Sequence, residues 1–262
     1  MRYRRGSLNV SNFRDEAILR SVGDSRYVTH SQLYEFAELE YGEFNRPVFN
    51  WRIRRMVEGG LVRKQSIPIL GGDARYSITR AGTQALERLG TYYLGANVEG
   101  SGNAHEFQVP HALAVNDIRL ILERTGTLKR WIPESLIRVL NLSPCHAYAK
   151  VYDGIATLEV AGQLLSVAVE FERTLKAAPK YEKIRQAIES EKQITAFLYL
   201  VPTNEVLFSL LHTFWRTEQS VLFGIFSDFK KERLGARVYQ ANYTSIPLLQ
   251  ALTNVAPAKT GT

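Results

Sequence analysis

The sequence predicts a protein of two unlike parts, a small and mainly helical N-terminal module and a larger C-terminal module with an α/β core. Residues 95–108 separate them, because this segment holds glycine, serine and asparagine and has no helical or strand period. Helical and strand patterns alternate after it, as in an α/β core. We expect a first domain over residues 1–95, a linker over residues 96–108, a second domain over residues 109–252 and a flexible tail over residues 253–262.

The composition is that of a globular protein, with 45% hydrophobic and 23% charged residues. No apolar run approaches the length that spans a bilayer, and the first residues do not resemble a secretory signal. The single cysteine, Cys145, excludes an intramolecular disulfide and a cysteine-rich zinc site. We expect a cytoplasmic protein that does not contact membranes.

The positive charge is concentrated in the N-terminal module. The chain has a formal net charge of +7, and residues 1–95 hold fifteen Lys or Arg against ten Asp or Glu. All of these basic residues except Lys64 are arginines. Arginine binds phosphates and guanine edges bidentately, so the arginines become informative if they share one surface.

The N-terminal module reads as three helices, two strands and a further helix. Thr29 and Asn45 are expected N-caps of the second and third helices, and Pro47 suits the first turn of the third. Gly59 and Gly60 end that helix. The predicted helices cover residues 12–22, 31–40, 46–58 and 79–89, and a turn at residues 70–73 joins strands at 61–69 and 75–79.

Three helices followed by a hairpin is the order of a winged helix-turn-helix. The phrase M-x-x-G-G-L-V-x-K … R-Y-S-I-T-x-A-G resembles many winged-helix proteins, and the resemblance covers residues 12–90. It implies that the third helix enters the major groove of double-stranded DNA.

The third helix separates into an apolar and a polar side at 100° per residue. The apolar side faces the first two helices and consists of Val48, Phe49, Ile53, Met56 and Val57. The outer side is predicted to read bases with Asn50, Trp51, Arg54 and Arg55, and Arg46 and Arg52 flank it for phosphates. In the hairpin, Arg63, Lys64 and Arg75 are the expected phosphate contacts. The alternatives are a merely solvated helix face and a protein-contact module. A homodimer would match pseudo-palindromic sites.

The C-terminal module reads as helix, strands, helix, strand, helix, strand. A helix follows Pro110, and strand-like stretches lie at residues 131–132 and 135–140. A hairpin is expected from strands at residues 155–160 and 164–171, a helix over residues 179–192, and buried strands at residues 194–201 and 220–227.

The hairpin carries the residues that suggest chemistry. Asp153 precedes its first strand, and Glu170 and Glu172 lie two apart near the end of the second, so their side chains share one face. An acid, a hairpin and a second acid form the layout of PD-(D/E)-x-K nucleases, which implies a restriction-endonuclease-like α/β domain. Asp153 and Glu170 would bind Mg²⁺ or Mn²⁺. Glu172 takes the usual lysine position, so Lys176 or Lys183 is the candidate cation.

The chain also resembles the replication-relaxation family of plasmids and mobile elements over residues 12–200. The phrases are H-x-L-x-V-N-D-x-R, W-x-x-E, D-G, V-E-x-E-R-T and K-Y-E-K-I. The family includes relaxases of the MOBC type, so the resemblance implies metal-dependent nicking at an origin during mobilisation or replication, with other relaxosome proteins as partners. It also implies that Asp153, Glu170 and Glu172 face the metal and that Tyr181 is a candidate phenolic nucleophile.

Two hypotheses stay open. One is a nicking enzyme that the N-terminal module directs to DNA. The other is a non-catalytic regulator or accessory factor, in which Glu170 and Glu172 form a solvated strand edge or a degenerate site and the second domain serves dimerisation or assembly. The histidines have no metal-ligand spacing and point to neither hypothesis.

Overall fold

The computed structural model describes residues 13–66, 73–90, 108–143 and 147–255. The chain divides into two compact units, Met1–Leu120 and Ile121–Thr262. Nearly all of the predicted linker and of the predicted turn at residues 70–73, together with Cys145, falls outside the described residues. The linker therefore stays a prediction.

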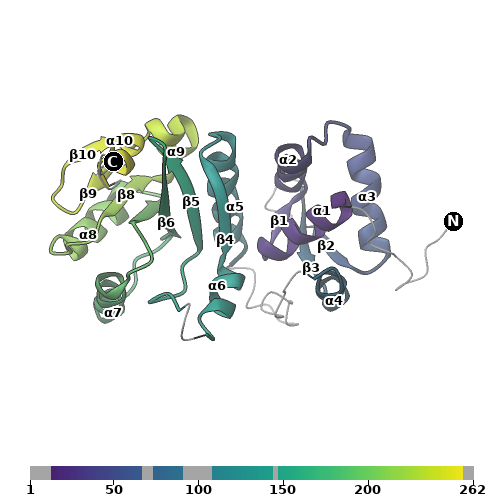
Figure 1. Cartoon of the computed structure of the whole chain (residues 1–262), viewed down its shortest axis with the longest axis horizontal. Coiled ribbons are helices and arrows are strands. Elements are labelled where there is room, and N and C mark those ends of the chain that lie inside the picture. The colour runs from purple at the N-terminus through teal and green to yellow at the C-terminus, as the bar shows by residue number, and fades with distance from the viewer. Residues whose placement is uncertain (1–12, 67–72, 91–107, 144–146, 256–262) are drawn as a thin grey trace, which may run out of the picture. The chain divides into compact units, whose positions relative to one another are not determined.

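The N-terminal unit contains the helices and the hairpin expected from the sequence. Its elements, drawn in Figure 1, are α1 (Phe13–Asp24), β1 (Val28–Thr29), α2 (His30–Tyr41), α3 (Arg46–Glu58), β2 (Val62–Ser66), β3 (Ala74–Ile78) and α4 (Arg80–Arg88). The sequence pattern missed β1, which pairs antiparallel with β3. Because β2 pairs with the other side of β3, the strand order is β1-β3-β2 and β3 is central.

The helix ends follow from local side-chain chemistry. The Thr29 side chain accepts a hydrogen bond from the Gln32 backbone N–H, and the Gln32 side chain accepts one from the Thr29 N–H, which completes a capping box at α2. Asn45 Oδ1 accepts from the Val48 N–H at the start of α3, as predicted. The C-cap of α3 is Gly59.

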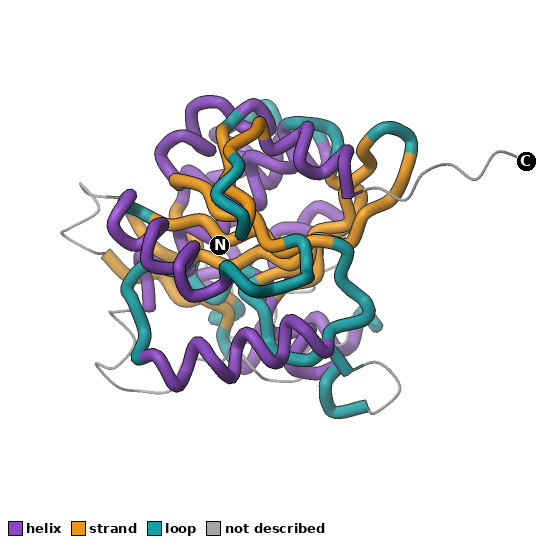
Figure 2. The backbone as a smooth tube through the Cα atoms, turned by 90° about the vertical axis from the view of Figure 1, so that its left-hand side faces the viewer, coloured by secondary structure: helices purple, strands orange, loops and turns teal. Residues whose placement is uncertain are grey.

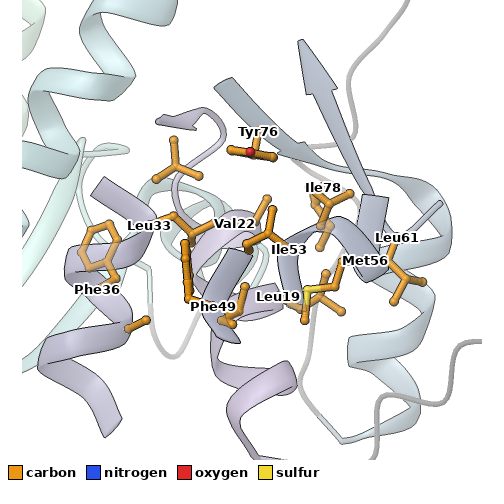
Figure 3. Packing of buried hydrophobic residues seen from close by; sticks show 14 of the residues in the cluster. Leu19, Val22, Leu33, Phe36, Phe49, Ile53, Met56, Leu61, Tyr76 and Ile78 are labelled. Atoms are coloured by element: carbon orange, nitrogen blue, oxygen red, sulfur yellow. The ribbon is translucent and has the colours of Figure 1, made fainter. Parts of the chain in front are cut away.

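One apolar core joins these elements (Figure 3). On α3 the buried side consists of Phe49, Ile53 and Met56, which confirms the predicted inward side at these positions. They pack with buried residues of the other helices and of the hairpin, among them Leu19, Val22, Leu33, Phe36, Tyr76 and Ile78. The position of α3 is thus set by apolar burial.

Helix α5 (Val109–Arg124) crosses the boundary between the units. Its part up to Leu120 packs within the N-terminal unit, whereas the sequence pattern placed the whole helix in the second domain. The Asn116 Nδ2 donates to the Tyr27 carbonyl at 2.7 Å. The Gln32 Nε2 donates to the Leu113 carbonyl at 2.8 Å.

The C-terminal unit is built on a mixed seven-stranded sheet in the order β10-β9-β8-β7-β6-β5-β4. Its strands are β4 (Leu128–Pro133), β5 (Gly154–Val160), β6 (Gln163–Phe171), β7 (Ala196–Val201), β8 (Val221–Ile225), β9 (Arg237–Gln240) and β10 (Ser245–Pro247). The pairs β6–β7 and β7–β8 are parallel, and the other pairs are antiparallel. Figure 2 shows helices on both sides of these strands. The fold class is therefore mixed α/β.

Most predicted elements of this unit are present, with two corrections. Residues 135–140, expected as strand-like, belong to α6 (Glu134–Leu140), and Pro133 occupies the N-cap position of this helix. α10 (Leu248–Val255) extends into the predicted flexible tail, because Leu248, Ala251 and Leu252 are buried in the unit. The remaining helices are α7 (Ala178–Ser190), α8 (Asn204–Phe214), α9 (Phe226–Glu232) and a 3₁₀ turn, η3 (Arg233–Gly235).

The β5–β6 hairpin sets the face on which the acids lie. A two-residue turn at Ala161 and Gly162, both with positive φ, fixes the register so that Gly154 lies opposite Val169. Ala168 faces the apolar core that β6 and β7 share with α7 and α8. Glu170 and Glu172 follow Ala168 at two-residue intervals, so they lie on this same face.

Within the described residues, no helix is long and apolar enough to cross a membrane.

Candidate functional site

Three exposed residues form a line along α3, which we call the α3 stripe: Arg46, Asn50 and Arg54. Residues four apart on a helix lie one above the other, so the three side chains share one side of α3. The guanidinium of Arg46 also lies over the Tyr34 ring, 4.8 Å from its centroid. The stripe therefore presents the Asn50 amide with one arginine on each side of it.

The other two arginines of α3 have a different position from the one predicted. Arg52 and Arg55 donate to the two carboxylate oxygens of Asp15 at 2.8 and 2.7 Å. Asp15 lies on α1 and is 2% exposed. Arg55 also lies over the Trp51 ring, 4.8 Å from its centroid. Arg52 and Arg55 thus tie α3 to α1, and Trp51 covers this junction instead of extending the stripe.

Asn50 is held by a residue that the sequence pattern did not indicate. His30, the first residue of α2, places its Nε2 2.8 Å from Asn50 Oδ1. Its Nδ1 lies 3.1 Å from the Tyr76 hydroxyl on β3. The three residues come from three elements far apart in the sequence, so no spacing in the chain could have identified them.

The hairpin exposes only part of the predicted basic set. Arg63 and Lys64 on β2 are exposed. Arg75 is 8% exposed, donates to Gln65 Oε1 at 2.7 Å and lies over the Tyr27 ring. Arg75 is therefore buried where the sequence predicted a surface residue, and its strand β3 is the central one of this sheet.

A groove of about 530 Å³ lies between α3 and the hairpin, which we call the α3 groove. Arg54 and Lys64 contribute cations to its wall, and Glu58 and Asp73 contribute carboxylates. Its other lining residues are His30, Asn50, Ile53, Val57, Ala74 and Tyr76. Asn50 and Arg54 of the α3 stripe thus line a groove in which both signs of charge are present.

The C-terminal unit carries a second group of charged residues, which we call the carboxylate–lysine cluster: Lys150, Asp153, Glu170, Glu172 and Lys176. The Asp153 Oδ2 accepts from the Phe171 backbone N–H at 2.8 Å, which joins the start of β5 to the end of β6. Lys150 Nζ donates to Glu170 Oε1 and lies 4.4 Å from the centroid of the Tyr152 ring. Lys150 was not among the predicted cations, although it lies only three residues before Asp153 in the sequence.

The predicted cations divide between the cluster and the surface. Lys176 donates through Nζ to the buried carboxylate of Glu172, so its charge is matched there. Lys183 is exposed on α7, and the structure shows no bond from it to either acid within its described residues. Tyr181 is 3% exposed and its hydroxyl accepts from the Lys176 N–H. Tyr181 is therefore a packing residue, and its placement does not favour a nucleophilic role.

The electrostatics of the cluster centre on Glu170. Burial raises the pKa of Glu170 to about 7, and the nearby charge of Asp153 adds to this rise, while Lys150 and Lys176 oppose it. Burial also raises the pKa of Tyr199 well above its usual value, and the charges of Glu170, Glu172 and Asp153 act in the same direction. The carboxylates, lysines and this phenol therefore share one electrostatic environment.

A divalent cation fits the chemistry of Asp153 and Glu170. The Tyr199 hydroxyl, which lies on the strand position paired with Glu170, is buried and has no hydrogen-bond partner within the part of the chain that the structure describes. The charge of Asp153 raises the pKa of Glu170, and a positive ion between the two carboxylates would oppose that rise. Mg²⁺ is usually held by one or two carboxylates with water. The described residues contain no group of three or more His, Cys, Asp or Glu in a metal-binding arrangement.

Comparisons with known proteins identify no family for this chain. No family model and no curated protein matches it. A solved structure, the restriction endonuclease FokI bound to DNA, is similar with 12% identity and a TM-score of 0.27 over 84% of this chain. The match spans 44% of that protein. The sequence resemblance to the replication-relaxation family therefore stays a prediction.

Proposed function

We propose that the chain is a DNA-binding protein whose N-terminal unit is a winged helix-turn-helix with α3 as its recognition helix. The observation that carries this proposal is the α3 stripe, an exposed line of arginine, asparagine and arginine on the third helix of the unit. Recognition helices present such side chains to base edges in the major groove. The antiparallel β2–β3 hairpin corresponds to the wing.

The positions of the polar and basic residues of the N-terminal unit support a proposed role for each. Asn50 faces a base edge, and Arg46 and Arg54 reach bases or phosphates on either side of it. Lys64 in the α3 groove and Arg63 beside it contact backbone phosphates, which set the register of the protein on DNA. Arg52 and Arg55 support α3 from behind through Asp15.

Double-stranded DNA binding is tested by fluorescence anisotropy with a labelled duplex over about 50 to 200 mM salt. We expect affinity to fall steeply as salt rises, because bound phosphates release counterions. The double variant Arg46→Ala/Arg54→Ala should bind more weakly, and its slope of log affinity against log salt should be smaller by about 1 for each phosphate that the variant no longer neutralises.

The matched control is Lys231→Ala, which removes an exposed charge from α9 in the other unit. It should leave both affinity and slope unchanged. Equal affinity of the double variant and the wild-type protein for the duplex would refute α3 as the recognition helix.

A second function, hydrolysis of a phosphodiester bond, is proposed for the carboxylate–lysine cluster. Lys150 supports it, because its ammonium group lies at Glu170 and supplies the cation that the sequence pattern lacks at Glu172. Asp153 and Glu170 would hold Mg²⁺ or Mn²⁺, which when bound would activate water and stabilise charge on the phosphate. Lys150 would bind a phosphate oxygen or orient the attacking water, and Asp153 keeps β5 and β6 together through the Phe171 N–H.

The cluster is tested by incubating the protein with supercoiled plasmid DNA and Mg²⁺ or Mn²⁺, and by titrating Mn²⁺ calorimetrically. We expect nicking by the wild-type protein, loss of nicking in Glu170→Gln and Lys150→Ala, and loss of Mn²⁺ binding in Glu170→Gln only. Glu189→Gln, an exposed change on α7, is the control and should behave as wild type. DNA binding without Mn²⁺ binding or nicking would instead support a non-catalytic regulator or accessory factor.

Nicking at a plasmid or mobile-element origin is the narrower form of this proposal. It rests on the sequence resemblance to replication-relaxation proteins, which also implies relaxosome partners, and a homodimer would suit a pseudo-palindromic site. A plasmid that carries candidate origin DNA, compared with the same plasmid without it, tests the preference.

A further inference from the structure

The amide of Asn50 belongs to a chain of hydrogen bonds that begins in the core of the N-terminal unit. Tyr76 is 3% exposed and its hydroxyl lies 3.1 Å from His30 Nδ1. The other ring nitrogen, Nε2, lies 2.8 Å from Asn50 Oδ1. The imidazole also packs against the Phe49 ring, with centroids 5.2 Å apart, so it is held from a third side.

The direction of each hydrogen bond follows from the groups involved. A side-chain amide oxygen only accepts, so His30 Nε2 must carry the proton. In the neutral imidazole Nδ1 then accepts from the Tyr76 hydroxyl. Burial raises the pKa of Tyr76 to about 12, so this hydroxyl keeps its proton at neutral pH. Each of the two hydrogen bonds thus has one donor and one acceptor: the Tyr76 hydroxyl donates to His30 Nδ1, and His30 Nε2 donates to Asn50 Oδ1.

We infer that His30 is a positioning residue that fixes the orientation of the Asn50 amide and so makes Asn50 the specificity-determining residue of α3. An exposed asparagine whose amide can turn over presents either its oxygen or its nitrogen to a partner. Because Oδ1 is held at His30, the Nδ2 amino group is directed away from it. Asn50 therefore acts on DNA as a donor, and it selects a base whose major-groove edge offers an acceptor, such as a purine N7.

The inference rests on the proposed DNA binding but can fail independently of it. It predicts that His30 affects the choice of base at one position without affecting attraction to phosphates, since phosphate contacts carry no sequence information. A side chain with a purely structural role would lower binding to all duplexes together.

The experiment selects binding sites from randomised duplexes with the full-length protein and sequences them. The variants are His30→Ala, Asn50→Ala and Tyr76→Phe, and Ser31→Ala, an exposed change next to His30, is the control. We expect Asn50→Ala and His30→Ala to lose preference at the same base pair, by roughly fivefold or more. Tyr76→Phe should lose part of it, and Ser31→Ala none. The salt slope of every variant should equal that of the wild-type protein, because none of these residues is assigned a phosphate contact. The affinity of His30→Ala and of Ser31→Ala for random duplex should also be unchanged.

Three results would overturn the inference: an unchanged preference in His30→Ala, an unchanged preference in Asn50→Ala, or a wild-type protein that binds duplexes with the expected salt dependence but selects no sequence. Circular dichroism identifies a variant that fails to fold. If His30→Ala does so, Tyr76→Phe decides, because it removes only the hydroxyl that anchors the imidazole. A wild-type protein that binds no duplex refutes the proposed function itself.

Discussion

Single side chains on α3 differ in ways that their angles on the helix do not reveal. Arg54 and Arg55 are neighbours in the sequence, yet Arg54 is exposed and Arg55 bonds to the buried carboxylate of Asp15. A wheel of α3 shows which residues point away from its apolar side, but it does not show which of them meet α1. The predicted DNA-contacting set therefore included residues that hold the unit together.

Glu170 gives the cluster a measurable pH dependence. Its pKa is about 7 in the folded protein against an ordinary value of 4.5, so between these pH values the folded state binds more protons than the unfolded state. The free energy of unfolding therefore falls as pH rises through this window. In Glu170→Gln, which cannot titrate, this fall is absent.

We predict that Glu170→Gln gains stability relative to the wild-type protein between about pH 5 and pH 8, by up to roughly 3 kcal/mol, since each unit of pKa corresponds to about 1.4 kcal/mol. Urea unfolding at both pH values measures the difference. The exposed variant Glu189→Gln should show no such change. A gap between Glu170→Gln and wild type that is the same at both pH values would contradict the raised pKa.

Among the secondary-structure elements, α4 shows why the segment T-x-A-G, from Thr79 to Gly82, opens a helix. The Thr79 hydroxyl donates to the Gly60 carbonyl at 2.6 Å and accepts from the Gly82 N–H at 3.1 Å, so it fastens α4 to the end of α3. A Cβ at Gly82 would lie 2.3 Å from the Leu61 carbonyl oxygen. Only glycine allows α4 to approach the start of the hairpin this closely.

We predict that Gly82→Ala destabilises the N-terminal unit by about 1 to 3 kcal/mol, the usual effect of overpacking, even though alanine favours helices. Thermal unfolding of the two proteins measures it. Gln84→Ala, an exposed change on the same helix, is the control and should be neutral or slightly stabilising. A Gly82→Ala protein as stable as the wild type would show that α4 does not need this close approach.

For the whole molecule, the division into units determines which N-terminal fragment of the chain is expected to fold stably. The sequence places the end of the first domain at residue 95, but α5 supplies Asn116 and Leu120 to the N-terminal unit. A fragment of residues 1–95 loses the partner of the Tyr27 carbonyl and part of the apolar core. A fragment of residues 1–124 keeps both.

We predict that the fragment of residues 1–95 melts at least roughly 10 °C below the fragment of residues 1–124, because 1 kcal/mol corresponds to about 4 to 8 °C in a unit of this size. Differential scanning calorimetry of the two fragments measures this. Asn116→Ala in the longer fragment, which removes the bonds to the Tyr27 carbonyl and to Gln32 Oε1 but keeps the apolar contacts of α5, should give a smaller decrease. Equal melting temperatures would place α5 outside the N-terminal unit.

Much of the local structure was predictable because its causes are local. Thr29 and Asn45 cap their helices, Pro47 lies in the first turn of α3, and the β5–β6 hairpin turns at Ala161 and Gly162. The predictions failed where a distant segment decides. β1 is too short to be recognised by its own pattern, and its partner β3 lies far along the chain. The error at residues 135–140 is instead local, because Pro133 occupies the N-cap of α6 two residues before the apolar stretch.

The sequence by itself determined most of the helices and strands, the apolar side of α3 and the positions of Asp153 and Glu170 around a hairpin, because residue periods and turn residues act over short stretches of chain. Only the tertiary structure decided that Arg52 and Arg55 bind Asp15, that His30 holds Asn50 and that Lys150 accompanies Glu170. The Asp15, His30 and Asn50 contacts join residues brought together by the burial of apolar surface. The Lys150 contact joins the segment before β5 to the end of β6, and no period of the sequence records which residue makes it.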